Sequence, residues 1–488
     1  MTNFSLRSLI CASILIGLGT GCTDQPNLDP STIQNTKAAR SAAAAQSDFI
    51  IQKGSYIIVS ATNALPSNLE AEVSKAKGRM GTQLKNIGVA TAVSADPDFA
   101  GKMERLPGIK SVIPDVSAKW IEATNSIDLQ DPQNAVQATA TNPNLNPYYG
   151  FQWQHKAINS NAAWQSGHRG EGVKVAILDT GYDLMHPDLA GNIIYSKSFV
   201  PNEGVQFNYP GFSHGTHVAG IVAALDNNIG VVGVAPKAKL QLIKVLSDSG
   251  RGSFSWILAG ILDAVDQKAD IINMSLGSYL PRNGKFIDDN GTPNDPSDDT
   301  VVSNTKAVQE LLVAMSRVIS YANQKGVTVI AAAGNDAING NKDKSGISIP
   351  ANLPHVLSVS ATGPTNWYED PQTDLDQIAS YSNFGTSDIS FSAPGGDSRL
   401  QPYMFWYFDM VLSTSQYGGY TFSAGTSMAA PHVAGVAALI IGKNGGPMAP
   451  ARVEAALRAS SDDLGKPGRD PLFGYGRVNA LRAVSTLK

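Results

Sequence analysis

Three polar residues stand at the edges of apolar segments, and their types could supply an orienting acid, a base and a nucleophile. Asp179 closes the apolar run 175–178, and His214 opens the segment HGTHVAG. Ser427 follows a glycine turn and stands at the start of an expected helix of small residues. The free backbone N–H groups and the dipole of such a helix start favour developing negative charge. Each signal is weak alone, because an Asp at a strand end is usually a turn-former or a cap.

The histidines of the second segment could also be metal ligands. His214 and His217 lie three residues apart and could bind zinc, but no glutamate of an HExxH motif lies between them.

In the order Asp, His, Ser, the three segments resemble the subtilisin-like serine proteases (subtilases), from about Trp153 to the C-terminus. The α/β-hydrolases place these residues in the order Ser, Asp, His, and chymotrypsin-like proteases in the order His, Asp, Ser. The resemblance implies that Ser427 is the nucleophile, that His214 takes its proton and that Asp179 holds the imidazole. It gives His217 no catalytic counterpart, so we expect structural hydrogen bonds from His217 and likewise from His432, in the helix after Ser427. It further implies a secreted endopeptidase of broad specificity that works through an acyl-enzyme.

Other segments resemble the parts of this family that bind the substrate. AAAGN at 331–335 looks like the oxyanion segment, with the Asn335 amide and the Ser427 N–H as donors. Two segments of small residues resemble the strands between which a peptide lies extended. No acidic residue stands near the expected pocket, which favours cleavage after apolar or aromatic residues over dibasic specificity. The candidate substrate-binding residues are Gly250, Gly252, Phe254, Ser275, Leu276, Gly277 and Gly334, although Phe254 and Leu276 could equally be ordinary core.

The segment LDNNIGV at 225–231 resembles the family's calcium loop. Calcium takes about six to eight oxygen ligands, including backbone carbonyls. A second acidic stretch, 288–299, either binds calcium or is a solvated loop, and its spacing does not match an EF-hand. The resemblance implies a structural calcium ion held by Asp188, Leu225, Asn227, Ile229 and Val231, with Asn146 as a candidate from the mature N-terminus.

The elements that must position these residues form a long alternation of apolar runs and helix-like segments. Continuous apolar runs at 173–178, 271–274 and 327–333 indicate a parallel sheet covered on both faces. With the resemblance, they imply a three-layer, doubly wound α/β peptidase domain over residues 148–488.

The region before this domain has a different pattern. Residues 49–118 alternate strand candidates with two helices, one over 66–84, and are compatible with a small ferredoxin-like α+β unit. The resemblance implies an inhibitory propeptide that is removed by autocleavage between Val116 and Asn146. Residues 119–147, rich in Asn, Gln, Pro and Thr, predict a linker.

The first 22 residues are typical of an export signal, with Arg7 before an apolar run too short to span a bilayer. Cys22 follows small residues, as at a bacterial lipoprotein processing site, although an ordinary signal peptide is the alternative. Residues 23–48 predict a tether. We expect a secreted or lipid-anchored monomer. The net charge of −4 without a Lys/Arg block argues against nucleic-acid binding.

Three other functions compete with this hypothesis. A non-catalytic binding scaffold is opposed by the filled catalytic positions, and an intracellular protease by the signal and propeptide. A peptide ligase stays open, because an amine can compete with water for the same acyl-enzyme.

Overall fold

The computed structural model describes residues 49–121, 126–129, 146–292 and 295–486, all within one contact unit, Gln46–Lys488. The predicted signal segment 1–22 with Cys22, and the tether 23–48, lie outside the described residues, as does most of the predicted linker. Among the described residues, no helix combines the length and apolar character that a membrane span requires.

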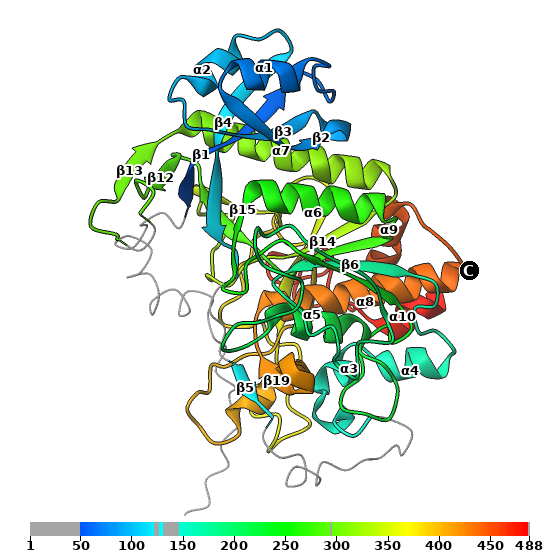
Figure 1. Ribbon diagram of the computed structural model, residues 1–488. Coiled ribbons are helices and arrows are strands. Elements are labelled where there is room, and N and C mark those ends of the chain that lie inside the picture. Colours follow the sequence, from blue (N-terminus) through cyan, green and yellow to red (C-terminus); the bar gives the residue numbers. More distant parts are fainter. Residues whose placement is uncertain (1–48, 122–125, 130–145, 293–294, 487–488) are drawn as a thin grey trace, which may run out of the picture. The chain divides into compact units, whose positions relative to one another are not determined.

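A seven-stranded parallel sheet forms the centre of the peptidase part (Figure 1). Its strands are the apolar runs expected from the sequence, and β6 and β10 are buried almost throughout. The order across the sheet is β17 (Phe391–Pro394), β16 (Val356–Thr362), β14 (Thr328–Ala332), β10 (Ile271–Met274), β6 (Lys174–Asp179), β8 (Lys239–Lys244) and β7 (Ile193–Ser198).

Helices cover both faces of this sheet, and alternate residues of β6 separate the two layers. Val175 and Ile177 share a core with α5 and α8, whereas Ala176 and Leu178 share a core with α6 and α7. This arrangement confirms the three-layer, doubly wound α/β fold. The first layer holds α5 (His214–Ala223), α8 (Thr426–Asn444), α3 (Trp153–Ala157), α4 (Ser160–Gln165), α9 (Pro450–Ser460) and α10 (Ala480–Thr486), and the second holds α6 (Phe254–Asp266) and α7 (Thr305–Gln324).

The N-terminal module, residues 49–119, is a separate antiparallel sheet with two helices and its own small core. Its strands follow the order β4-β1-β3-β2, with every pair antiparallel. This βαββαβ sequence is compatible with the ferredoxin-like unit expected from the sequence. The elements are β1 (Ile50–Ser60), α1 (Leu69–Lys75), β2 (Gly78–Leu84), β3 (Val89–Ser94), α2 (Phe99–Glu104) and β4 (Ile109–Lys119).

The helix predicted over 66–84 was wrong in its second half. α1 ends at Lys75, and Met80 belongs to β2, where it pairs with Ala92. Lys77 adopts a positive φ of 62°, which ends the helix. The next residue, Gly78, has no room for a side chain, because a Cβ there would lie 2.5 Å from the Phe99 ring. The apolar spacing that suggests one long helix therefore covers a helix, a tight turn and a strand.

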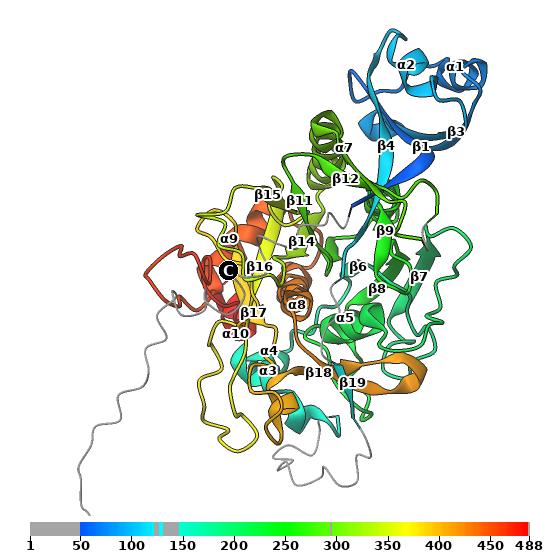
Figure 2. The same ribbon diagram turned by 90° about the vertical axis from the view of Figure 1, so that its left-hand side faces the viewer.

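Strands of the peptidase part extend the module's sheet. β9 (Arg251–Ser253) pairs with the end of β4, and β12 (Lys285–Asp288) pairs with the start of β1. β9, β4, β1, β12 and β13 thus follow one another across this end of the sheet, and Figure 2 shows β4 running from the module toward β9. The remaining strands are β13 (Thr300–Ser303), which pairs with β12; β11 (Ser278–Pro281) with β15 (Gly346–Ile349); and β18 (Val411–Thr414), β19 (Tyr420–Ser423) and β5 (Ser126–Asp128).

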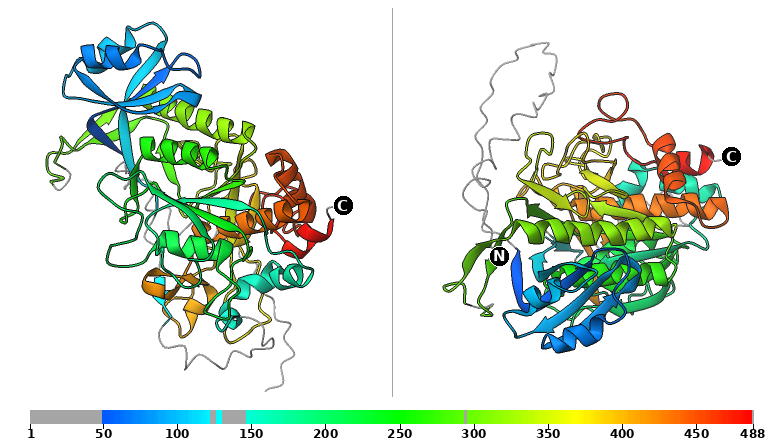
Figure 3. Two further views of the ribbon diagram at one scale, coloured as in Figure 1. Left: turned by 45° about the vertical axis from the view of Figure 1, so that its right-hand side comes forward. Right: turned by 90° about the horizontal axis from the view of Figure 1, so that it is seen from above.

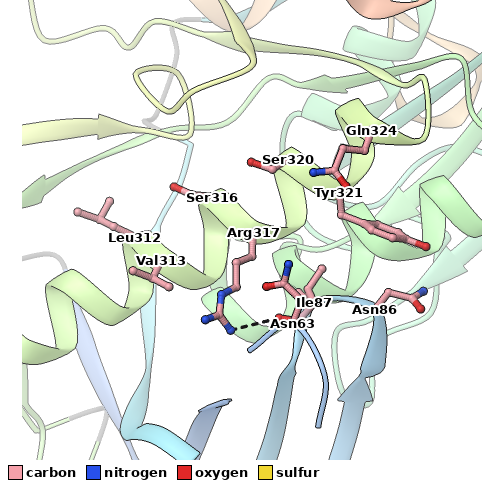
Figure 4. Close-up of a pocket in the computed structure, with 10 residues that line it drawn as sticks. All are labelled: Asn63, Asn86, Ile87, Leu312, Val313, Ser316, Arg317, Ser320, Tyr321 and Gln324. Atoms are coloured by element: carbon pink, nitrogen blue, oxygen red, sulfur yellow. Dashed lines mark hydrogen bonds between the residues drawn. The ribbon is translucent and has the colours of Figure 1, made fainter. Parts of the chain in front are cut away.

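The module lies over α6 and α7 (Figure 3). Arg317 of α7 donates hydrogen bonds to three backbone carbonyls of the module, those of Ser60, Thr62 and Ile87, at 3.1–3.4 Å. Figure 4 shows this guanidinium in a pocket that α7 and the module line together. Two ion pairs add to the contact, Lys110 with Glu310 and Lys306 with Glu104.

Candidate active site

Asp179 and His214 are joined by a short hydrogen bond in the interior. Asp179 is the last residue of β6, and its Oδ1 lies 2.8 Å from Nδ1 of His214, the first residue of α5. The same oxygen accepts from the Thr180 N–H at 2.7 Å, and Asp179 has no exposed surface. This geometry holds one ring nitrogen and leaves the other, Nε2, without a partner among the described residues.

Ser427 is the second residue of α8, which packs against α5. Its hydroxyl donates to the Ser275 carbonyl at 3.0 Å, so in this conformation the serine is not bonded to His214. Pro431, four residues on, has no N–H to reach the Ser427 carbonyl, and the Ser275 hydroxyl donates to that carbonyl at 2.7 Å instead. Ser275 thus fixes the backbone that carries the nucleophile candidate.

Asn335 follows β14 and faces the start of α8. Its Oδ1 accepts from both the N–H and the hydroxyl of Thr426, at 2.9 and 2.8 Å. With the oxygen held in this way, the amide presents its NH2 group as a donor. Asn335 therefore lies beside Thr426, the residue before Ser427.

Gly334 makes the turn before Asn335. Its φ is +107°, and a Cβ there would lie 2.3 Å from the Asn383 amide. Asn383 in turn donates to the Ala333 carbonyl and accepts from the N–H groups of Asp336 and Ile338. Sequence reasoning missed Asn383 and Thr426, because their role depends on contacts across the fold.

The two predicted peptide-binding segments are bonded to the chain's own residues 117–120. Ala118 pairs with Gly252 in antiparallel register. The Trp120 N–H donates to Gly250 O at 3.0 Å, and Gly277 N–H donates to Trp120 O at 2.9 Å. The chain thus lies extended between Gly250–Gly252 and Gly277, in the position expected for a substrate.

The side chain of Trp120 fills the apolar subsite predicted at Phe254 and Leu276. Its ring lies 5.1 Å from the Phe254 ring, edge to face, and all three residues share one buried cluster. The indole N–H donates to Gly252 O at 2.8 Å. The sequence analysis placed Trp120 in a linker. The apolar alternation of β4 continues to this residue and is the signal that could have found it.

Residues 126–128, which also belong to the predicted linker, form β5 and pair with β19. Leu129 N–H donates to Tyr420 O at 2.9 Å, and Thr421 donates to the Asp128 carboxylate at 2.6 Å. β19 is the strand that leads to Ser427. Part of the predicted linker 119–147 is therefore a strand, because β19 offers it an edge.

The other two histidines of the motifs are buried and neutral. His217 Nε2 lies 2.9 Å from Thr421 O, and His432 Nδ1 lies 2.8 Å from Met428 O. Burial lowers the pKa of both to about 3. Their partners are backbone carbonyls, as expected for structural histidines, and no cluster of three His, Cys, Asp or Glu side chains suited to a metal occurs within the described residues.

The predicted calcium loop gathers oxygen atoms around Asn146 and Asp188, which are both buried. The Asn146 NH2 group donates to Leu225 O at 2.7 Å and also to Val231 O, while its Oδ1 accepts from the N–H of Asn227. Asn146 therefore lies at the loop as predicted, but its NH2 group, and not its oxygen, faces the two carbonyls.

Asp188, which reaches the loop from the segment before β7, is the acidic residue among the predicted ligands. Its Oδ2 accepts from the Val231 N–H and the Tyr420 hydroxyl, whereas Oδ1 is buried and accepts no hydrogen bond within the described chain. Burial raises its pKa to about 6. An unpaired buried carboxylate oxygen beside converging carbonyls fits a hard cation such as calcium. Asn227 lies in the same loop. Among the described residues, no hydrogen bond joins the Ile229 carbonyl to Asn146 or Asp188.

Comparisons with known proteins show which family this chain resembles. The family model described as "Subtilase family" (peptidase S8) matches residues 170–476. A subtilisin of Bacillus pumilus is 36% identical over 327 residues, covering 67% of this chain and 96% of that protein. A thermophilic serine proteinase of Bacillus sp. (strain AK1) is 30% identical over 439 residues, covering 89% of both. The solved structure of a lanthipeptide protease aligns with a TM-score of 0.55 at 30% identity, covering 69% of this chain and 94% of the other.

The match covers more than half of the chain, and the identity extends over most of the relatives' length. This chain therefore belongs to the subtilase family of serine proteases. It is a hydrolase of the subtilisin type, as its fold and its buried Asp179–His214 pair indicate.

Proposed function

We propose that this chain is an exported serine endopeptidase with Ser427, His214 and Asp179 as its triad. The Ser427 hydroxyl turns from the Ser275 carbonyl and attacks the scissile carbonyl carbon as its proton passes to His214 Nε2. Asp179 holds the ring and stabilises the imidazolium. His214 then gives the proton to the leaving amine, and water releases the acyl group from Ser427 by the same proton route.

The negative charge that develops on the carbonyl oxygen needs donors held in advance. The Asn335 NH2 group and the Ser427 N–H supply them, and the bonds from Thr426 fix the amide before the substrate arrives. Neutral imidazole is required for the first proton transfer, so activity should rise through neutral pH.

The observation that carries the proposal is the extended chain at 117–120 between the two peptide-binding segments. A segment bonded there blocks substrate, so the module acts as an inhibitory propeptide. Ile121 is the last described residue before Ser126, which pairs near the nucleophile. We place the autocatalytic cut between Ile121 and Ser126, inside the wider interval expected from the sequence.

The subsite occupied by Trp120 supports a preference for large apolar or aromatic residues upstream of the cut. Phe254 supplies the ring contact, and Gly252 O accepts an indole proton. Specificity elsewhere is broad, because recognition is mostly backbone pairing. Cleavage of a peptide library should show this enrichment, and dominance of Arg or Lys would contradict it.

Self-processing is tested with the chain lacking residues 1–22, beside its Ser427→Ala variant. We expect the wild type to yield fragments cut between Ile121 and Ser126 and to digest casein, while the variant stays whole and inactive. Intact mass identifies the cut. A wild type that stays whole and inactive although folded would contradict the proposal.

We also propose that the 225–231 loop binds a structural calcium ion. Asp188 and the carbonyls of Leu225 and Val231 would hold it, with Asn227 and Ile229 as further ligands. When bound, the ion supplies positive charge to the buried Asp188 carboxylate. It takes no part in the chemistry of the triad.

Calcium binding is tested by thermal unfolding of the Ser427→Ala chain, which cannot digest itself. At about 100 times its dissociation constant, calcium should add about 2.7 kcal/mol to the free energy of unfolding, and chelator should remove it. Asp188→Asn should lose this response, whereas Asp226→Asn, outside the proposed ligands, should keep it. An unchanged melting temperature with chelator would contradict the site.

Export rests on residues 1–22, and Cys22 is the candidate for a lipid anchor. Incorporation of labelled fatty acid into the wild type but not into Cys22→Ser would support anchoring, whereas its absence from both would favour free secretion of a monomer.

A further inference from the structure

The β12–β13 hairpin, residues 285–303, belongs to the peptidase part but pairs with the N-terminal module. Ile287 lies opposite Ile50 of β1, and the Ile287 N–H donates to Phe49 O at 2.8 Å. The family resemblance assigns this hairpin no role. Its position at the module, away from Asp179 and His214, indicates that it contacts the module and not the reacting groups.

Four aromatic rings link the hairpin to the substrate cleft. Phe49 packs between Phe286 of the hairpin, at 6.3 Å edge to face, and Phe254 of α6, at 6.4 Å. Trp120 packs against Phe254 in turn, at 5.1 Å. All four rings are at most 2% exposed. Phe49 belongs to the module and Trp120 directly follows its last strand, so removal of the chain up to the proposed cut would uncover the other two.

The hairpin depends on the module for its packing. Each of its strands has four residues, and an isolated two-stranded hairpin is marginally stable in water. Val301, opposite Ile287, is 62% exposed, whereas Phe286 is fully buried and Ile287 is 7% exposed. The start of β1 therefore completes the inner side of the hairpin.

The contact lies far along the chain from the proposed cut. Cleavage between Ile121 and Ser126 frees the end of β4 but leaves Phe49 and Ile50 paired with the hairpin. Exit of the module then requires Phe49 to leave two buried rings and β1 to leave an edge strand.

We propose that the β12–β13 hairpin is a clamp that retains the cleaved N-terminal module in the cleft. Its partner is this chain's own module, in which Phe49 packs against the Phe286 ring and accepts a backbone hydrogen bond from Ile287. Loss of this contact, and not the cut itself, sets when the cleft opens to other substrates. The inference rests on the proposed self-processing, although the clamp contact can be tested without it.

The contact is tested by hydrogen exchange of the full chain carrying Ser427→Ala, which needs no processing. Phe286→Ala should speed amide exchange of peptides covering residues 49–60 at least about tenfold, since local opening controls their exchange. Val301→Ser, in the same hairpin but at a largely exposed position without an aromatic contact to Phe49, should change nothing. Equal exchange in all three proteins would overturn the clamp. Should Phe286→Ala fail to fold, Phe49→Ala removes the same contact from the other side.

The consequence is tested in the active chain. Wild-type fragments should co-elute on size exclusion after the cut, and hydrolysis of a small chromogenic peptide should begin only after a lag. Phe286→Ala should shorten that lag about tenfold at an unchanged rate of cutting, and Val301→Ser should not. Separation of wild-type fragments without a lag would overturn the proposal. A wild type that is never cut contradicts self-processing instead, and hydrogen exchange still decides the clamp.

Discussion

The catalytic centre and the contact between module and peptidase are built in opposite ways. Asp179 ends β6, His214 begins α5 and Ser427 is the second residue of α8, so each lies at the end of a buried element. The module is held by β9, β12 and α7, which contribute edges, rings and a few charges. In the proposed function, catalysis depends on three side chains held at the ends of buried elements. Retention of the module depends instead on strand pairing, ring packing and ion pairs spread over its contact surface.

This difference predicts how the two regions respond to mutation. Single changes at the centre should remove most of the rate, because the groups act as a unit. Single changes at the contact should alter only how long the module stays bound to the peptidase part, because many separate contacts contribute to its binding.

The largest effect is expected at the triad. Ser427→Ala should lower turnover by about 10⁶-fold, the loss known for this group in subtilisin itself, and Asp179→Asn by about 10⁴-fold, as in a comparable serine protease. The aspartate change leaves His214 in the wrong tautomer. Turnover is measured on a chromogenic peptide, with thermal unfolding as the control for folding. A residual rate near that of the wild type would place the nucleophile elsewhere.

Asn335→Ala should cost about 10²–10³ in kcat, a magnitude taken from subtilisin. KM should change little, because the amide acts on the charge that develops in the transition state. The exposed Asn444→Ala, at the far end of α8, serves as a control with unchanged kinetics. A rise in KM at constant kcat would instead assign Asn335 to substrate binding.

Arg317→Ala tests the contact at α7. A charged donor to three carbonyls is lost, so the module should leave about tenfold to a hundredfold faster after the cut. Ser320→Ala, on the same helix and in the same pocket, is the matched control. The lag before peptide hydrolysis reports departure. An unchanged lag would mean that α7 contributes shape and not hydrogen bonds.

Asp115 of the module should make its retention depend on pH. Its carboxylate is buried against the start of α6, accepts from the Ser255 hydroxyl at 2.6 Å and has its pKa raised by burial to about 6. Because the bound pKa exceeds that of a free Asp, about 3.9, the complex favours the protonated form. Retention is therefore strongest below the free value and weakens as pH rises through about 6.

Between pH 5 and 7 we expect departure to quicken by about tenfold, since each pKa unit corresponds to about 1.36 kcal/mol. Asp115→Asn should remove this dependence, which is read from the lag at each pH after correction for the rate of the free enzyme. A lag that lengthens as pH rises would contradict the sign.

The sequence predicts the parallel sheet and brings Asp179 and His214 to one edge of it, but it does not predict the contact with the module, for a physical reason. The apolar runs that become β6, β10 and β14 predict the parallel sheet, and the motifs at its edges predict the triad and the Asn335 donor. The alternation of β4 marks Trp120 as a buried position but does not identify its partner, and Phe286 carries no such local signal. Trp120 bonds to Gly252, which lies more than 130 residues away, and Phe286 packs on Phe49, at the start of the module. No periodicity in the sequence encodes such a partner.

The start of the N-terminal module shows the same limit. Leu69, Val73 and Met80 have helical spacing, yet the positive φ of Lys77 and the crowding at Gly78 divide them between a helix and a strand. The predicted calcium loop falls between the two cases, since its residues are local but the amide orientation of Asn146 follows from the fold.

The most direct test of the account is reaction of the full chain with an alkyl fluorophosphonate, followed by intact mass. The reagent bonds to an activated serine oxygen through phosphorus and releases fluoride, so it reports a competent and accessible nucleophile in each species at once. We predict that the uncut chain and the cut complex that still holds its module stay unlabelled. The peptidase freed of its module should carry one label, on Ser427. Labelling of the uncut chain at the same rate, or of another residue, would contradict the claim that a serine protease centre lies behind its own N-terminal module.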